Sequence, residues 1–291
     1  MILSGIINFL DLLFRKELAL EVDNPGFLIG VAQKDLKKIL ITLDVTDEVI
    51  NEAIQLHAGL LIVHHPLIYD PLKTITSQEN IQSKILKLIE NGIAVYAAHT
   101  NYDVMPGGLN QLVAEKIGLK NIGILEPLQG INGPENKFAN AAGIGRVGNL
   151  ESEKTLKDFL KELKKRLDLE SLQWLSNNRD ADIKRKIKRI AVINGGANSS
   201  ADFLLAHKFP TDAGIQALDA VIVGELKYSN ALKIAESGII VIVVGHAESE
   251  KLAIAGMAEI IRHFLESNNI HNDIEVLKSK TGYLPWRYYF E

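Results

Sequence analysis

The chain has 291 residues, 47% of them apolar and 23% charged, and a formal net charge of -4. This length and composition are typical of a globular protein of one or two domains with a large core, and they lack the basic balance of a nucleic-acid-binding chain. The chain contains no Cys, which excludes disulfides, thiolate nucleophiles, iron–sulfur clusters and cysteine zinc fingers. Any metal ligands must therefore be His, Asp or Glu.

The first 14 residues carry apolar side chains at helical spacing. Asp11 interrupts the apolar run and the first cation is Arg15, so this segment is expected to be an amphipathic helix rather than a signal peptide. The longest later apolar stretch, 238–245, is too short to span a bilayer. We therefore expect a cytoplasmic protein with no membrane partner.

Short runs of Val, Ile and Leu alternate along the chain with longer amphipathic stretches, as is typical of α/β proteins with mainly parallel sheets flanked by helices. Strands are expected at 38–45, 60–63, 93–97, 139–146, 190–193, 220–223 and 239–244. Helices are expected at 46–58, 77–91, 151–167, 199–206, 227–236 and 248–265, with one more after Gly107-Gly108. Thr46 is the expected N-cap of the first of these helices.

Two similar α/β domains are indicated by a weak internal repeat. Residues 90–99 and 236–246 each end a helix with Gly, begin a strand and place a His after that strand. The Gly-, Asn- and Pro-rich segment 129–136 is the expected linker. The predicted domains are 1–128 joined by the C-terminal 246–291, and 129–245.

Four of the eight histidines directly follow predicted strands: His64, His65, His99 and His246. Ligands of open α/β sheets bind outside the carboxyl ends of the strands, so these residues are candidate metal ligands. The alternative is that each ring is a structural His whose hydrogen bonds are satisfied within the protein. For the His64-His65 pair, the two interpretations stand about even.

A carboxylate follows two of these histidines at the same spacing. Asp103 lies four residues after His99, and Glu250 lies four residues after His246. If a helix has begun by His246, this spacing places His246 and Glu250 on one face, where both can bind one cation. The alternatives are that Asp103 caps a turn and that Glu250 is favoured by a helix N-terminus.

These six side chains offer only nitrogen and oxygen ligands, which suit zinc, manganese, iron or cobalt. Six ligands exceed the need of one tetrahedral ion, so two divalent metal ions per chain are predicted. Two ions about 3.5–4 Å apart can share a bridging carboxylate and activate water. Asp103 and Glu250 are the expected bridging, catalytic residues.

Two glycine-rich segments are candidate phosphate sites. Gly143–Gly148 fits the G-x-G-x-x-G pattern, but no helix opens within it, so its glycines are expected to allow close packing of the backbone. Asn194–Ala197 is expected to form a tight turn. The alternative is that the backbone amides of this second segment bind an anion.

The motifs together resemble those of the NIF-three-like family, also called the GTP cyclohydrolase I type 2 homologues. The segments that carry the resemblance are His64-His65-Pro66, His99…Asp103 and Gly245-His246…Glu250, with further matches at 23–26, 43–46, 143–148 and 224–228. The resemblance extends from about residue 20 to the C-terminus.

This resemblance implies a NIF-three-like fold of two similar α/β domains, a dinuclear metal site between them and a ring-like homohexamer. The family's metal ligands would map onto His64, His65, Asp103, His246 and Glu250, with His99 near the metals. Similar proteins often carry a His after the Lys-Tyr pair, where this chain has Ser229. The substitution puts catalytic activity in question.

The predicted function is that of a dinuclear-metal-dependent hydrolase, in which metal-activated water attacks a nucleotide-like or phosphoester substrate. The alternative is a non-catalytic metal-binding oligomer that binds a partner or regulates it. A metal store is a third hypothesis. The residues identify neither the substrate, nor the metal, nor a protein partner.

Overall fold

The protein is described by a computed structural model that covers residues 3–128, 141–206, 209–211, 214–270, 273–281 and 286. The chain divides into two compact units. Unit 1 comprises Met1–Tyr102 and Ala253–Trp286, and unit 2 comprises Asp103–Leu252. The expected linker, 129–136, lies outside the described residues.

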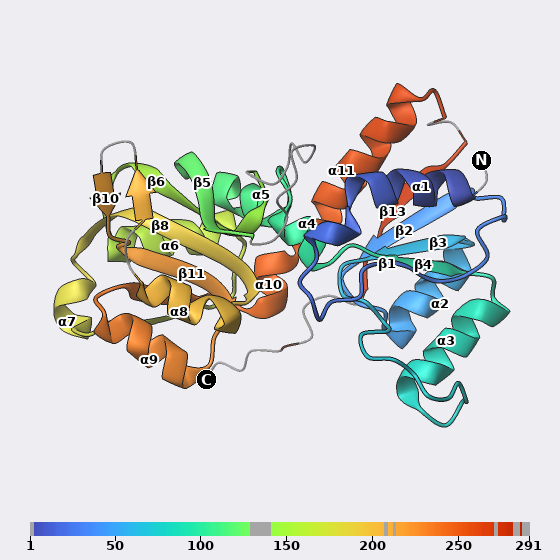
Figure 1. Ribbon diagram of the computed structural model, residues 1–291, viewed down its shortest axis with the longest axis horizontal. Coiled ribbons are helices and arrows are strands. Elements are labelled where there is room, and N and C mark those ends of the chain that lie inside the picture. The colour runs from blue at the N-terminus through green and yellow to red at the C-terminus, as the bar shows by residue number, and fades with distance from the viewer. Residues whose placement is uncertain are drawn as a thin grey trace. The chain divides into compact units, whose positions relative to one another are not determined.

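Unit 1 contains a five-stranded sheet in the order β1-β4-β3-β2-β13 (Figure 1). Four of its strands run parallel, and β1 pairs antiparallel with β4 at the edge. The central strands β3 and β4 are completely buried, which explains why they are continuous apolar runs. The strands are β1 Gly26–Ile29, β2 Lys38–Thr42, β3 Leu60–Val63, β4 Ala94–Ala97 and β13 Glu275–Lys278.

Helices cover both faces of this sheet (Figure 1). Those of unit 1 are α1 Leu3–Leu13, α2 Asp47–Leu56, α3 Asn80–Glu90 and α11 Leu252–Ser267, with a short 3-10 helix at Lys16–Leu18. Apolar residues of α2 and α3 pack on one face of the sheet. On α1 and α11, Phe9 stacks against Phe264. The expected N-cap is confirmed, because the side chain of Thr46 accepts a hydrogen bond from the Val49 amide.

The segment after β13 is attached to α2 through Glu52. Its carboxylate accepts hydrogen bonds from the Ser279 hydroxyl at 2.6 Å, the Lys280 amide at 3.0 Å and the Thr281 hydroxyl at 2.9 Å. Burial raises the pKa of Glu52, but these hydrogen bonds outweigh it and hold the pKa below its ordinary value. The ionised carboxylate therefore stabilises the folded state of unit 1.

Glu52→Gln is expected to destabilise the protein by about 1–2 kcal/mol at pH 7, since hydrogen bonds to a charged group are lost. A group with a depressed folded pKa stabilises above its unfolded pKa, and this contribution disappears as the pH falls through the folded value. Urea unfolding should therefore give a lower free energy of unfolding for the variant than for wild type at pH 7, and equal values for the two proteins in acid. Glu266→Gln, at an exposed position on α11, is the control. A constant difference across this pH range would contradict the assignment.

Unit 2 contains a mixed six-stranded sheet in the order β5-β6-β8-β11-β12-β7. The strands β8, β11 and β12 run parallel, whereas β5, β6 and β7 pair antiparallel with their neighbours. These six strands are β5 Lys120–Pro127, β6 Gly143–Thr155, β7 Gln173–Leu175, β8 Lys186–Gly196, β11 Ala220–Glu225 and β12 Ile240–Val243. A separate hairpin is formed by β9 Phe209–Thr211 and β10 Gly214–Gln216.

Helices α8 and α9 bury apolar residues against one face of this sheet, with Leu204 and Ile234 in the core. The helices of unit 2 are α5 Leu109–Lys116, α6 Leu156–Arg166, α7 Arg179–Asp182, α8 Ala201–Leu205, α9 Tyr228–Glu236 and α10 His246–Glu250, with a 3-10 turn at Asn198–Ser200. The short helix α4, Thr100–Val104, crosses the division between the units.

Two expected helices differ clearly from the structure. The helix expected from residue 151 begins only at Leu156, because β6 continues to Thr155 and pairs with the start of β8. Thr155 then caps α6 by accepting a hydrogen bond from the Asp158 amide. The helix expected at 248–265 is instead two helices, α10 and α11.

The α/β fold with helix-flanked sheets is confirmed, and both units contain a strand–helix–strand segment. In unit 1, β3 and β4 are parallel neighbours joined through α3; in unit 2, β11 and β12 are parallel neighbours joined through α9. These are the two segments of the internal repeat. Among the described residues, no helix is long and apolar enough to cross a bilayer.

Candidate metal centre

Three histidines of unit 1 gather at the carboxyl ends of two adjacent parallel strands. His64 and His65 directly follow β3, and His99 follows β4. One nitrogen of each ring lies within 4.8 Å of the others, and the ring centroids are 5.1–5.5 Å apart. The predicted gathering of these three side chains is therefore present, with His64 fully buried.

Each of these rings is oriented through its Nδ1 atom. The Nδ1 atoms of His64, His65 and His99 lie 2.8, 2.9 and 2.8 Å from the Ala98 carbonyl, Asp44 Oδ1 and Asp23 Oδ1. A carbonyl or an ionised carboxylate can only accept, so in each pair Nδ1 carries the proton. The neutral ring then has its lone pair on Nε2, the arrangement found in metal-ligating histidines.

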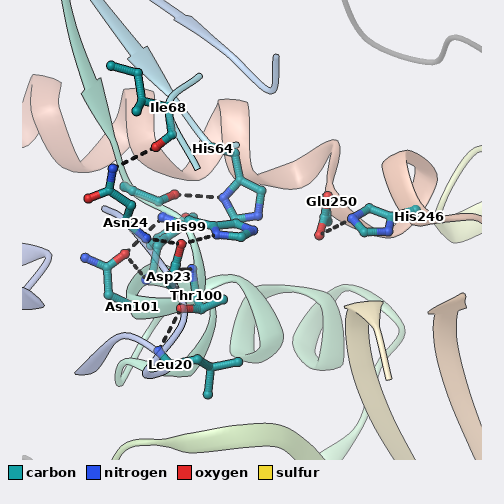
Figure 2. A network of polar contacts seen from close by, with 12 residues as sticks. Leu20, Asp23, Asn24, His64, Ile68, His99, Thr100, Asn101, His246 and Glu250 are labelled. Carbon is teal, nitrogen blue, oxygen red and sulfur yellow. Dashed lines mark hydrogen bonds and ion pairs between the residues drawn. The ribbon is translucent and has the colours of Figure 1, made fainter. Parts of the chain in front are cut away.

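Asp23 is the buried partner that orients His99, and its side chain is 1% exposed. It also accepts hydrogen bonds from the amides of Asn24 and Thr100, at 2.7 and 3.1 Å, and from the Thr100 hydroxyl (Figure 2). Burial raises the pKa of Asp23, but His99 and these donors outweigh it and lower the pKa. Asn24 donates to the Ile68 carbonyl, which attaches this loop to the segment after His65. Asp23 is thus held as a carboxylate beside the histidine cluster.

Asp23→Asn is expected to weaken divalent-metal binding by about 10-fold, because the candidate residue His99 would lose the negative partner that orients its ring and raises its basicity. The measurement is a competition titration with a chromophoric chelator. Asp11→Asn is the matched control, since Asp11 accepts a hydrogen bond from Tyr96 elsewhere in unit 1. Equal affinities for wild type and Asp23→Asn would contradict a role of His99 in metal binding.

Unit 2 brings together the other three predicted ligands. His246 begins α10 directly after β12 and Gly245, and its Nε2 lies 3.2 Å from Oε1 of Glu250 (Figure 2). On the other side of the ring, Nδ1 lies 3.4 Å from Oε1 of Glu225 at the end of β11. A carboxylate oxygen of Asp103 lies within 4.8 Å of one from Glu250. The i, i+4 arrangement of His246 and Glu250 is confirmed.

Glu250 is only 2% exposed and ends α10. Glu250 therefore does not lie in the first turn of α10 as the alternative of a favourable helix N-terminus would require of that helix. Two carboxylates and an imidazole held this close together are costly to bury without a cation, because the carboxylates repel one another. These donors, like the three histidines of unit 1, fit a divalent metal such as zinc, manganese, iron or cobalt.

A glycine at the end of β8 makes room for this donor group. Gly195 has φ of +61°, and a Cβ there would lie 2.3 Å from Glu250 Oε1 and 3.3 Å from His246 Nε2. Its amide donates to the Ser249 hydroxyl at 2.9 Å, and that hydroxyl donates to the His246 carbonyl. The Asn194 and Ala197 amides also donate to acceptors within the protein. Residues 194–196 form the end of β8 instead of the expected tight turn, and these three amides are committed to protein acceptors rather than to an anion.

The G-x-G-x-x-G segment lies within β6, between β5 and β8. A Cβ at Gly143 would come within 2.6 Å of the Glu126 carbonyl oxygen, one at Gly145 within 2.7 Å of that of Val192, and one at Gly148 within 2.9 Å of that of Lys120. No helix opens within the segment. The glycines permit close strand packing, as expected.

Sequence reasoning missed the residues that orient the ligands: Asp23, Asp44, Glu225 and Gly195. All four fall in segments noted for the family resemblance or as an expected turn, but none of them was expected to orient a candidate ligand. Their signal is an acidic residue or a glycine at a strand end. Such residues are common in turns, so that signal alone does not separate a ligand partner from a loop residue.

An α/β fold with histidines and carboxylates at its strand ends defines a class of candidate metal-binding α/β proteins. The family model Duf34/NIF3 (NGG1p interacting factor 3) matches residues 1–282, so the chain belongs to this family. The resemblance noted in the sequence is thereby confirmed.

Relatives match over nearly the whole chain. The GTP cyclohydrolase 1 type 2 homolog of Clostridium perfringens is 32% identical over 286 residues, covering 98% of this chain and 99% of the relative. Among solved structures, the Staphylococcus aureus protein SA1388 is 26% identical with a TM-score of 0.85, covering 99% of both chains. A Bacillus cereus protein related to NIF3 also has a TM-score of 0.85, at 24% identity and 99% coverage of both chains. The latter similarity supports the fold alone.

Proposed function

We propose that the protein is a hydrolase that depends on two divalent metal ions, with His64, His65, Asp103, His246 and Glu250 as ligands and His99 beside them. The observation that supports the proposal best is the donor chemistry. In unit 1 three imidazole nitrogens lie within 4.8 Å of one another, and in unit 2 Glu250 lies within that distance of both His246 and Asp103, so all six side chains are imidazoles or carboxylates. Six donors exceed the need of one ion, which supports two ions per chain.

When bound, such ions supply Lewis acidity, which polarises a substrate and lowers the pKa of water. The residues of this chain hold and orient the site. The Ala98 carbonyl and Asp44 keep His64 and His65 in the tautomer that presents Nε2. Asp103 and Glu250 bring two negative charges to one place, as a bridging role requires. Glu225 lies next to the other ring nitrogen of His246, Nδ1, and helps to orient the ring.

The proposed substrate is nucleotide-like or a phosphoester. Support comes from the name of relatives such as the Clostridium perfringens protein, a GTP cyclohydrolase 1 type 2 homolog, and from the two-metal arrangement, which suits hydrolysis at phosphorus or at a polarised carbon. Both substrate types offer anionic oxygens that a divalent ion can bind.

The test is metal reconstitution followed by a substrate screen on untagged protein. Stripped protein should regain two metal ions per chain, and turnover of a nucleoside triphosphate or an activated phosphodiester should depend on the metal. Asp103→Ala should abolish that turnover. Less than one ion per chain after reconstitution, or full turnover by Asp103→Ala, would contradict the proposal.

The second candidate function is that of a non-catalytic metal-binding oligomer, and Ser229 favours it. This residue is exposed in the first turn of α9, four residues beyond Glu225. A serine hydroxyl does not exchange protons near neutral pH as an imidazole does. Stoichiometric metal binding by a stable oligomer, with no turnover by either wild type or Ser229→His, would favour this function over hydrolysis.

A further inference from the structure

A buried arginine of unit 2 lies outside the set of candidate ligands. Arg146, on β6, is 2% exposed. Burial lowers its pKa to about 10, so the side chain remains charged at neutral pH. Burying a guanidinium is costly unless its donors are satisfied. The acceptors of its hydrogen bonds therefore identify the segments that this side chain holds in place.

All five donors of Arg146 are used, and they join two parts of unit 2. Nη1 donates to the carbonyls of Gly143 and Gly145, each at 2.8 Å, on its own strand. Nη2 donates to the carbonyls of Val104 and Met105 at 3.2 and 3.0 Å. Nε donates to Gln111 Oε1 on α5 at 3.1 Å. The guanidinium thus fixes the two residues that directly follow Asp103.

Asn110 makes a second contact with the backbone of this segment, at Asp103 itself. Its Nδ2 donates to the main-chain carbonyl of Asp103 at 3.0 Å. Its Oδ1 accepts a hydrogen bond from the Asn194 amide, also at 3.0 Å, at the end of β8. Asn110 is 2% exposed. The next residue of that strand is Gly195, whose missing side chain leaves room for Glu250. The buried side-chain amide of Asn110 therefore connects the backbone of Asp103 to the end of β8, next to Glu250.

We infer that Arg146 and Asn110 are positioning residues that set the Asp103 carboxylate against Glu250 for metal binding. The inference rests on the proposed function, because it assigns Asp103 as a ligand. The inference also predicts that lysine cannot replace Arg146. A lysine keeps the charge, but its single ammonium has three donors and cannot reach four carbonyls and an amide oxygen in two directions.

Unit 2 offers a matched control for a buried guanidinium. Arg189 lies on β8, is 9% exposed, and has its pKa lowered by burial. It is near the start of that strand, whereas Asn194 and Gly195 are at its end. Arg189→Lys therefore tests what a buried Arg-to-Lys change costs in the same sheet, away from Asp103.

The experiment measures Co²⁺ affinity and the visible spectrum of the Co²⁺ protein for wild type, Arg146→Lys, Asn110→Ala, Arg189→Lys and Asp103→Asn. Circular dichroism confirms folding at the working temperature. Both positioning variants should bind Co²⁺ about 10–100-fold more weakly, as expected when the support of a ligand is lost, with a shifted spectrum. Arg189→Lys should retain wild-type affinity and spectrum even if its melting temperature falls. Asn110→Ala carries the test if Arg146→Lys does not fold.

Wild-type Co²⁺ affinity and spectrum in the folded positioning variants, with weak binding by Asp103→Asn, would overturn the inference and leave the proposed metal site intact. An equal loss of affinity in Arg189→Lys would also overturn it, by showing a general effect of sheet stability. Failure of wild type to bind Co²⁺, or unchanged binding by Asp103→Asn, would overturn the proposed function and this inference together.

Discussion

Glu250→Gln is expected to bind divalent metal at least about 100-fold more weakly than wild type, a loss of roughly 2.7 kcal/mol. Glu250 is buried, 3.2 Å from His246 and within 4.8 Å of a carboxylate oxygen of Asp103. The amide retains the shape of the side chain but removes the charge and one ligand oxygen. Competition titration with Zn²⁺ and Co²⁺ measures the effect.

The same substitution separates a metal site from a structural carboxylate. Removing one of two close carboxylate charges relieves repulsion in the metal-free protein, so its melting temperature should not fall. Added metal should then raise the melting temperature of wild type much more than that of Glu250→Gln. Glu236→Gln, at the exposed end of α9, is the control and should behave as wild type. An unchanged metal affinity in Glu250→Gln would contradict its role as a ligand.

Gly195→Ala is expected to lose both stability and metal binding. The residue has φ of +61°, where an L side chain costs about 1 kcal/mol or more. Its new Cβ would lie 2.3 Å from Glu250 Oε1, so the carboxylate must move. We expect unfolding to become easier by about 1–3 kcal/mol and metal affinity to fall by at least about 10-fold.

Gly123→Ala is the matched control for this glycine. It lies on β5 of the same sheet, and a Cβ there would have no heavy atom within 4 Å apart from its chain neighbours. Urea unfolding and metal titration of both variants separate the general effect of the substitution from the local one. If Gly195→Ala retained wild-type metal affinity, Glu250 would not depend on the space that this glycine leaves.

Much of the fold follows from local patterns. The buried run Leu60–Val63 forms β3 with the predicted bounds, because it is a short apolar segment flanked by Gly59 and Pro66, which favours a buried strand over a helix. The start of α6 was predicted wrongly for a non-local reason. The charged residues 151–154 suit a helix, but β6 continues through them, and Lys154 pairs with Ile187 of β8. Tertiary pairing overrides such propensities.

The candidate ligands could be found because each is a polar residue next to a buried strand or four residues beyond such a position. The residues that orient these ligands could not be found, because they contact residues far away in the sequence. Asp23 is 76 residues from His99, and Asn110 is 84 residues from Asn194. The role of Gly195 depends on a positive φ and on a side chain 55 residues away in sequence, Glu250. No local pattern reports such a contact.

Anomalous diffraction from crystals of the metal-reconstituted protein, measured at several absorption edges, tests the proposed metal centre most directly. It locates, counts and identifies the ions in one measurement. We expect two ions per chain about 3.5–4 Å apart. Their ligands should be His64, His65, Asp103, His246 and Glu250. A single ion, or peaks away from these side chains, would contradict the proposed dinuclear site.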